Sequence, residues 1–404
     1  MVATLADPPM PPIPPIPSSP SSHEGIEFSF TEDQDMVREQ VRRFAEERIR
    51  PGVEERDRAH RFPEEVLREM GELGFLGMTV EEKYGGAAVD TLTYLLAVEE
   101  VARVCPATAV TMTVSSSVCA WPIGLFGTEE IKRRALPALA SGEALGGFGL
   151  TEPGSGSDAA SMRTTARRDG DFWVLDGEKA WITNAGFAKW YVVMARTNPE
   201  AGKKGISAFA VPADAPGFSV GKPEEKLGLK ASRTAQIFFN QCRIPAENLL
   251  GTEGQGLRIA MATLDHSRLG IAAQALGIHQ RALELAVAYA NERVQFGVPI
   301  ARHQAIQFKI ATMATDLAAA RALTYAAATL DHTSDAGRTA AQAKLFASEA
   351  ANRACQESLQ IHGGNGFHED YEIARLYRDV RVTTIYEGTS EMQRLVIARH
   401  LLQG

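Results

Sequence analysis

Residues 169–177 read Asp-Gly-Asp-Phe-Trp-Val-Leu-Asp-Gly, and this stretch decides which kind of fold the chain adopts. Two Asp-Gly dipeptides, at 169–170 and 176–177, bracket the short apolar run 172–175. Asp-Gly is typical of tight turns between antiparallel strands, so the stretch predicts turns at both dipeptides. Further short apolar runs follow, with Pro and Gly in the connections. We therefore predict an antiparallel sandwich or barrel over residues 147–255.

Helical periodicity lies on both sides of this β region. Before it, Thr31 and Gln34 form a capping-box pattern, and the small, apolar stretch 110–126 predicts a helix packed on several sides. After it, the long alanine-rich segments 257–291, 304–331 and 339–361 predict an antiparallel four-helix bundle. The predicted fold class is α+β. Its domains are an N-terminal helical domain at 26–146, a middle β-domain at 147–255 and a C-terminal helical domain at 256–404.

Residues 1–25 differ in composition from the rest of the chain, because they hold eight of its 20 prolines. We expect a disordered or polyproline-like extension, which is more plausibly a passive tail than a docking motif. The segment lacks the basic start and apolar run of a secretory signal, and it lacks the arginines of a mitochondrial presequence. The sequence therefore predicts a cytoplasmic protein.

Charge and cysteine content argue against several classes of protein. The formal net charge of -8 argues against a dedicated nucleic-acid binder, which needs a basic face. The four cysteines form no CxxC pair and have no histidines at metal-ligand spacing, so we expect buried free thiols and no metal site. No window approaches 18 uninterrupted apolar residues, so we expect no membrane span.

A glycine- and serine-rich segment at 150–159 reads LTEPGSGSDA. Gly154, Gly156 and Ala159 match a dinucleotide-binding fingerprint, but that fingerprint must follow a parallel strand and open a helix. Here the glycines lead into predicted hairpins. What remains is a polar loop whose N–H groups and hydroxyls could hold anionic or carbonyl oxygens. Alone this is a weak signal, since most Gly/Ser loops are only loops.

Two further segments could contact a flat cofactor. Trp181 and Thr183 lie two apart on a predicted strand, so they face one side and could cover an aromatic ring and bond its edge. Packing of Trp181 inside the β-domain is the alternative, and the residues alone favour it. The segment 360–366, QIHGGNG, ends a helix with two glycines, which suits either ordinary C-capping or close approach to a pyrophosphate. We expect His362 to be structural, not catalytic.

Glu387 lies in the segment 385–391, IYEGTSE, just before the final predicted helix. Apolar Ile385 and Tyr386 flank it, and an apolar setting raises the pKa of a carboxyl group toward neutrality, where it is an effective base. The alternative is an acid at a helix start, stabilised by the helix dipole, and Glu391 fits that description better. Local chemistry leaves the two interpretations of Glu387 about even.

Together the four segments resemble the signature motifs of the acyl-CoA dehydrogenase family, in the same order and spacing. The resemblance runs from about residue 27 to the C-terminus. It implies an FAD-dependent oxidoreductase that converts an acyl-CoA thioester to a trans-2-enoyl-CoA. Glu387 matches the catalytic glutamate, which removes the α-proton while the β-hydride goes to flavin N5. Its backbone N–H and a flavin hydroxyl would polarise the thioester carbonyl. Some members place the base one position before Arg268, but here that residue is Ser267, which cannot serve.

The resemblance also implies which residues contact the ligands. Family members often have Tyr at the position of Phe148, so a hydroxyl is missing there. The FAD contacts of one subunit would be Phe148, Leu150, Thr151, Gly156, Ser157, Trp181 and Thr183. The residues that reach the partner's FAD would be Arg293, Gln295, Phe296, Gln304, Gln360, Gly363 and Gly364, with Thr389 and Glu391 near its adenosine end. The CoA contacts would be Ser157, Asp265, Arg268 and Gly388.

The resemblance further implies a homotetramer built as a dimer of dimers, with electron-transfer flavoprotein as electron acceptor. Such an enzyme would act in fatty-acid β-oxidation or amino-acid catabolism. The stretches 264–277 and 114–127 look most like the short-chain, butyryl-CoA type, so we expect a short straight or branched acyl-CoA. The alternatives are a nitroalkane oxidase or flavin monooxygenase on the same fold, and a non-catalytic scaffold or DNA-binding relative. The intact motif around Glu387 and the acidic net charge favour the dehydrogenase.

Overall fold

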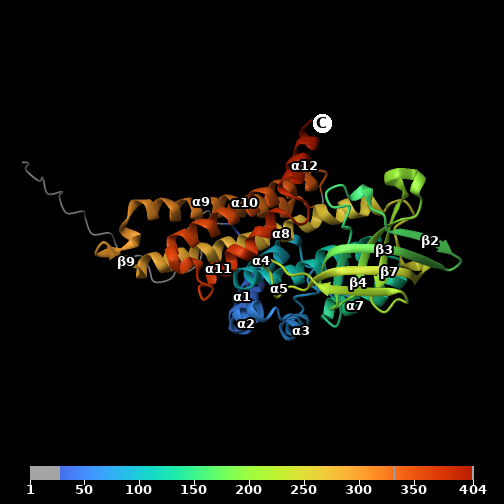
Figure 1. The fold of residues 1–404 in the computed structure, drawn as a ribbon, viewed down its shortest axis with the longest axis horizontal. Helices are drawn as coiled ribbons and strands as arrows, with labels where there is room; N and C mark the ends of the chain where they lie inside the picture. Colours follow the sequence, from blue (N-terminus) through green and yellow to red (C-terminus); the bar gives the residue numbers. More distant parts are fainter. Residues whose placement is uncertain (1–27, 332, 403–404) are drawn as a thin grey trace, which may run out of the picture.

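The sheet and the far ends of the long helices lie at opposite ends of an elongated molecule (Figure 1). This computed structural model describes residues 28–331 and 333–402. The Pro-rich segment 1–25, for which we expect an extension, lies outside the described residues. Along the described chain the order is helices, then strands, then helices, so the predicted α+β class is confirmed.

The N-terminal helices begin with the predicted capping box. Gln34 N donates to Thr31 Oγ1 at 3.2 Å, and Thr31 N donates to Gln34 Oε1 at 3.0 Å. A π-helical turn, η1 (Ala45–Ile49), continues the first helix. The α-helices of this region are α1 (Glu32–Phe44), α2 (Val53–Ala59), α3 (Glu64–Glu72), α4 (Thr91–Val104), α5 (Pro106–Thr113), α6 (Trp121–Phe126) and α7 (Glu129–Ser141).

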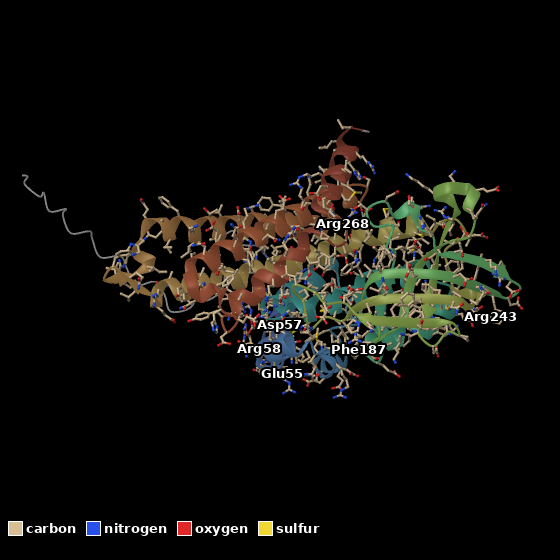
Figure 2. All side chains as sticks on the ribbon, viewed as in Figure 1. Glu55, Asp57, Arg58, Phe187, Arg243 and Arg268 are labelled. Atoms are coloured by element: carbon tan, nitrogen blue, oxygen red, sulfur yellow. The ribbon has the colours of Figure 1, made fainter. Side chains whose placement is uncertain are left out.

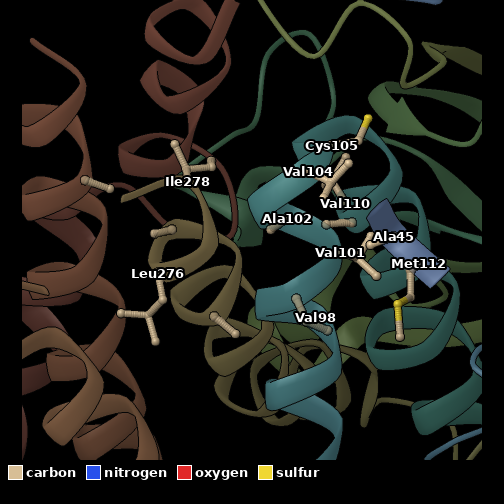
Figure 3. Packing of buried hydrophobic residues seen from close by; sticks show 14 of the residues in the cluster. Ala45, Val98, Val101, Ala102, Val104, Cys105, Val110, Met112, Leu276 and Ile278 are labelled. Carbon is tan, nitrogen blue, oxygen red and sulfur yellow. The ribbon is translucent and has the colours of Figure 1, made fainter. Parts of the chain in front are cut away.

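The helix from Pro106 to Phe126 combines α5, a π-helical segment η4 (Val114–Ala120) and α6. By length and hydropathy it could cross a membrane, but 78% of its most apolar window is buried inside the molecule. Val110 and Met112 lie beside residues of α4 (Figure 3) and belong to the same buried cluster as residues of the long helix α8 (Gly256–Glu292). The segment is thus a core helix, as its small, apolar residues predict.

Eight strands form one sheet in the order β6-β7-β3-β2-β4-β5-β8, with β1 beside β4. β1 runs parallel to β4, with Phe148 opposite Val192, so the prediction of a purely antiparallel domain is wrong there. The chain between β1 and β4 is the β2–β3 hairpin, and so this parallel pair needs no crossover helix. The strands are β1 (Leu145–Gly149), β2 (Thr165–Asp169), β3 (Phe172–Thr183), β4 (Ala188–Arg196), β5 (Ile206–Pro212), β6 (Phe218–Pro223), β7 (Thr234–Pro245) and β8 (Leu249–Leu250).

Only one of the two Asp-Gly dipeptides makes a turn. Asp169 pairs with Phe172 at the end of the β2–β3 hairpin, so the first prediction is confirmed. The second is wrong, because Gly177 lies inside β3, where the register with β7 shifts. Its φ of 137° and the close approach of Thr164, whose Cα would lie 2.7 Å from an added Cβ, explain why glycine is needed in this bulge.

The C-terminal helices α8, α9 (Gln304–Thr329) and α10 (Ala336–His362) lie side by side, with the shorter α11 (Glu372–Val380) as the fourth member. A small hairpin of β9 (Val294–Gln295) and β10 (Val298–Pro299) joins α8 to α9 at the end of the molecule far from the sheet (Figure 1). The last helix, α12 (Ser390–Leu402), projects from the body.

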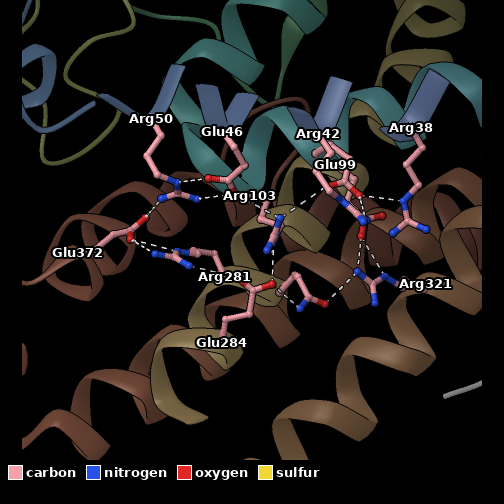
Figure 4. A network of polar contacts seen from close by, with 12 residues as sticks. Arg38, Arg42, Glu46, Arg50, Glu99, Arg103, Arg281, Glu284, Arg321 and Glu372 are labelled. Carbon is pink, nitrogen blue, oxygen red and sulfur yellow. Dashed lines mark hydrogen bonds and ion pairs between the residues drawn. The ribbon is translucent and has the colours of Figure 1, made fainter. Parts of the chain in front are cut away.

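A network of buried ion pairs joins the N-terminal helices to the C-terminal ones (Figure 4). Glu100 of α4, only 2% exposed, accepts hydrogen bonds from Arg38 Nε and Arg42 Nη2 of α1, both at 2.8 Å. Burial alone would raise the pKa of Glu100, but the hydrogen bond from Arg42 and the charges of both arginines lower it to about 2. Next to it, Glu99 accepts from Arg321 Nε of α9 at 2.9 Å. Because these charges satisfy one another, the helices are held in one arrangement.

Candidate active site

Glu387 occupies a tight turn just before α12. Its φ is 51° and that of Gly388 is 92°, and a left-handed backbone at a non-glycine residue costs roughly 1–3 kcal/mol. Three hydrogen bonds hold the turn: Gln393 Nε2 donates to the carbonyl oxygens of Glu387 and Gly388 at 3.2 and 2.8 Å, and Lys344 Nζ donates to that of Gly388 at 2.7 Å. The strained conformation is therefore imposed by side chains from α10 and α12.

The carboxylate of Glu387 is half-buried and has one hydrogen-bond donor among the described residues. That donor is the hydroxyl of Ser267, on α8, which bonds to Glu387 Oε2. Burial raises the pKa of Glu387, and the Ser267 hydrogen bond and the charges of Lys344 and Arg268 offset only part of that effect. The structure thus gives the raised pKa that the apolar flanking residues predict, as a general base requires.

The backbone N–H of Glu387 donates to no acceptor among the residues that the structure describes. In the turn, both neighbouring carbonyl groups are occupied, whereas this donor is left for a ligand. Tyr386 is fixed next to it by a hydrogen bond from its hydroxyl to Gln274 Oε1 of α8. One residue therefore presents a carboxylate and an amide donor together.

Lys344 was not singled out in the sequence analysis, although it holds the turn. It is 0% exposed, and burial lowers its pKa to about 8 while the charge of Glu387 acts in the opposite direction. A lysine within the alanine-rich run 340–351 of a packed helix was the available signal, because a buried lysine needs a partner. Its partner, 44 positions away in the chain, was not evident.

Asp265 and Arg268, two of the expected CoA contacts, lie on α8 within one turn of Ser267. Arg268 is 4% exposed, and its Nη1 donates to Asp265 Oδ1. Its Nε is buried with no partner among the described residues. Figure 2 shows Arg268 near the base of α12, between the long helices and the sheet. The structure thus brings Asp265, Arg268 and Gly388 together around Glu387.

The side chain of Trp181 points away from the sheet and does not fill its core. Its φ is 62°, the register with β7 shifts between Lys179 and Ile182, and the side chain is 61% exposed. The packing interpretation is therefore wrong, because Ile182, at 2% exposed, takes the inward place. Thr183 beside it is half-buried. The next residue, Asn184, ties the strand to the helical domain by donating to Thr111 O and Gly146 O at 3.1 and 2.9 Å.

The loop that follows β1 is anchored at Glu152. Its carboxylate accepts from Lys179 Nζ at 2.7 Å and from the backbone of Arg163 and Thr164 at 2.6 and 2.9 Å. Lys179 is 0% exposed, so the anchor is part of the sheet's interior. Beyond it the loop is open: Gly156 and Ser157 are exposed, whereas Phe148 and Leu150 at its start pack inward and Thr151 is half-buried.

Family comparisons agree with this geometry. The N-terminal, middle and C-terminal domain models of acyl-CoA dehydrogenase match residues 31–143, 147–242 and 254–402. The chain belongs to the acyl-CoA dehydrogenase family. It is 50% identical to the bovine mitochondrial short-chain specific acyl-CoA dehydrogenase, over 92% of this chain and 91% of that one.

Solved structures of the family superpose closely. Butyryl-CoA dehydrogenase from Megasphaera elsdenii matches with a TM-score of 0.91 and 43% identity, over 93% of this chain and all of that one. An acyl-CoA dehydrogenase from Bacillus anthracis, solved with FAD, matches with a TM-score of 0.87 and 36% identity, over 93% of this chain and 67% of that one. The protein is accordingly an acyl-CoA dehydrogenase, an oxidoreductase of fatty-acid or amino-acid metabolism.

The remaining expected contacts of this acyl-CoA dehydrogenase lie elsewhere on the chain. Thr389 and Glu391 flank the start of α12, beside Glu387. The others lie at the far end of the long helices (Figure 1). There the His362 ring stacks on that of Tyr289, with 4.3 Å between the ring centroids, which is a structural contact. This exposed set comprises Arg293, Gln295, Phe296, Gln304, Gln360, Gly363 and Gly364. Within one chain this set lies at the opposite end of the long helices from the sheet, whose strand β3 includes Trp181 (Figure 1).

Proposed function

We propose that this acyl-CoA dehydrogenase uses FAD to form a trans double bond between Cα and Cβ of a short-chain acyl-CoA, with Glu387 as the base. The observation that carries the proposal is the pairing, within one residue, of a half-buried carboxylate and a backbone N–H that donates to none of the described residues. The thioester oxygen would accept a hydrogen bond from that N–H. Since this bond stabilises developing enolate charge, it acidifies the α-C–H that Glu387 then deprotonates.

The residues present fit FAD. Trp181 offers an exposed indole face at the end of β3, and the open loop around Gly156 has no atom within 4 Å of an added Cβ, which leaves room for a ligand. Bound FAD would supply the acceptor for the β-hydride. The other residues would orient the thioester, with Arg268 and Asp265 toward CoA and Ser157 at the loop.

A short acyl chain is supported by the names of the bovine and Megasphaera relatives and by the residues beside Glu387. Tyr94 of α4 is 2% exposed, and burial and the charge of Glu387 both raise its pKa, so a phenol ring lies close to the carboxylate. With Tyr386, the residue before Glu387, it would limit the length of an acyl chain bound beside the carboxylate. One methylene group in such a pocket changes discrimination by about 1–3 kcal/mol.

A panel of acyl-CoAs tests the reaction and the chain length together. Anaerobic mixing with butyryl-CoA should bleach the flavin absorbance, and longer straight chains should bleach it more slowly. If short, medium and branched acyl-CoAs all leave the flavin oxidised, the proposed reaction is wrong. If only longer chains reduce it, the reaction stands and the short-chain assignment falls.

We also propose a homotetramer built as a dimer of dimers, which passes electrons to electron-transfer flavoprotein in the cytoplasm. The far end of the long helices exposes a group of apolar side chains, Val294 (51%), Phe296 (96%) and Phe308 (62%), and such a group supports a second subunit there. The four buried free cysteines suit a reducing compartment. Dilution to monomer should release FAD, whereas a stable FAD-loaded monomer would contradict the shared site.

A further inference from the structure

Ser267 lies in a position where its single hydroxyl proton has two acceptors. Its Oγ is within hydrogen-bond distance of Glu387 Oε2 and, at 3.3 Å, of the backbone oxygen of Leu264. The residue is 0% exposed, so water does not compete for either bond. A hydroxyl donates one hydrogen bond and accepts up to two. Only one of the two oxygens can therefore receive the Ser267 proton at a time.

We propose that Ser267 is a positioning residue that holds the base in both of its protonation states. While Glu387 is ionised, the Ser267 hydroxyl donates to its carboxylate. When the α-C–H bond breaks, its electron pair stays on the substrate and its proton forms an O–H bond on Glu387 Oε2, the oxygen that Ser267 contacts, and that O–H then donates to Ser267 Oγ. The Ser267 proton then turns to the oxygen of Leu264. No proton leaves Ser267, since only the direction of the hydrogen bond changes.

The other groups around Glu387 do not provide this function. Lys344 Nζ, from α10, donates to the Gly388 oxygen, and Arg268 Nη1 donates to Asp265. His266 of α8 is bonded to Asp331, with 2.9 Å between Nδ1 and Oδ2. The phenols of Tyr94 and Tyr386 complete the surroundings, and that of Tyr386 donates to Gln274. Among the described residues, Ser267 alone donates to the carboxylate.

Removing the hydroxyl should affect the base through its titration. In Ser267→Ala, the buried carboxylate loses its donor, and a hydrogen bond to a charged group lowers a carboxyl pKa by about one unit or more. The acid limb of kcat/KM, below which Glu387 is protonated, should shift upward by about one pH unit. At a pH below that limb the activity should fall about tenfold, and at high pH it should fall less.

The matched control is Ser348→Ala. Ser348 of α10 is also 0% exposed, and its hydroxyl donates to the oxygen three residues earlier, Leu345, at 3.2 Å. This variant loses the same helix bond without touching Glu387, so its acid limb should match that of the wild type. Ser267→Thr keeps a hydroxyl and should restore the wild-type limb, while Ser267→Gly supplies the same loss of hydroxyl if the alanine variant does not fold.

Two readouts on the FAD-loaded enzyme decide the matter: the pH profile of kcat/KM with butyryl-CoA, and the titration of the Glu387 carboxyl followed by infrared difference spectroscopy against Glu387→Gln. Parallel upward shifts in both support the proposal. Unchanged titration in Ser267→Ala and Ser267→Gly overturns it. The inference rests on the proposed role of Glu387 as base, which has its own test. Full activity in Glu387→Gln would reject that role. If Glu387→Gln is inactive but the Ser267 variants keep the wild-type pH profile and carboxyl titration, only the role of Ser267 is rejected.

Discussion

Two buried regions of the molecule enclose glutamates in opposite ways. Glu100, in the network between the N-terminal and C-terminal helices, receives hydrogen bonds from two arginines, and its pKa falls to about 2 in spite of burial. Glu387 receives one hydrogen bond, from the Ser267 hydroxyl, while the nearby Lys344 bonds to a backbone oxygen instead. The pKa of Glu387 is raised. A carboxylate that is fully paired stabilises the fold. One that is incompletely paired keeps a raised pKa.

The largest effect should follow from Glu387→Gln. Loss of the general base should reduce kcat by roughly 10³-fold, while the isosteric amide keeps the turn and FAD binding. The free energy of unfolding should increase although the activity falls. Because the folded pKa of Glu387 is raised, its charge costs stability above that pKa, and this cost is relieved as the pH falls through it. The variant should thus melt slightly higher near neutral pH, as calorimetry can measure; a lower melting temperature would contradict the comparison.

Glu100→Gln should destabilise the protein and leave the chemistry intact. It removes the negative charge that accepts hydrogen bonds from Arg38 and Arg42 in the buried network, and breaking a buried pair costs about 3 kcal/mol. Urea unfolding with a wild-type m-value measures this loss, and kcat at low temperature should not change.

The pH dependence of the same pair has a definite sign. The folded pKa of Glu100 lies below the unfolded value, so its contribution is complete above pH ~4 and disappears as the pH falls toward about 2. Wild type should therefore lose stability over that range, and the variant should lose less. If both lose the same amount, Glu100 is not the group responsible.

Lys344→Met should have an intermediate effect. Without the bond to the Gly388 oxygen, the left-handed turn at Glu387 loses one of its three supports, and misplacement of the base should lower kcat roughly 10-fold. The folded pKa of Lys344, about 8, lies below the unfolded value, so wild-type stability should rise with pH between about 8 and 10. That rise should be absent in the variant. The control is Lys309→Met, because Lys309 of α9 forms its ion pair with Glu357 of α10 near the surface, away from the turn at Glu387.

Local patterns allowed parts of this arrangement to be predicted. The capping box at Thr31 and Gln34 depends on residues three apart, and the direction of the Glu387 pKa shift was predicted from the apolar residues beside it, although burial by the whole fold is its main cause. The donor Ser267 lies 120 positions from Glu387, so only the packing of α8 against the turn brings them together. The sequence offers Ser267 only as a residue that cannot act as the base, and its hydrogen bond to Glu387 could not be inferred from the sequence.

The errors in the β-domain have the same origin. Asp-Gly at 176–177 has the composition of a turn, yet the approach of Thr164 makes it a bulge within β3. Trp181 has the large apolar side chain that is typical of a core residue, but the second register shift of β3 turns it outward. In both cases the partner strand decides, and a single strand's sequence does not contain that information.

The smallest effect should come from a glutamate that is well bonded but exposed. Glu69 accepts from Arg48 Nε and Nη2, both at 2.8 Å, and the hydrogen bond from Arg48 lowers its pKa. Its geometry is as good as that of Glu100, but water can replace the arginine, and surface ion pairs contribute little. Glu69→Gln should therefore leave the melting temperature within experimental error. A loss as large as that of Glu100→Gln would mean that bond geometry, and not burial, decides what a paired glutamate contributes here.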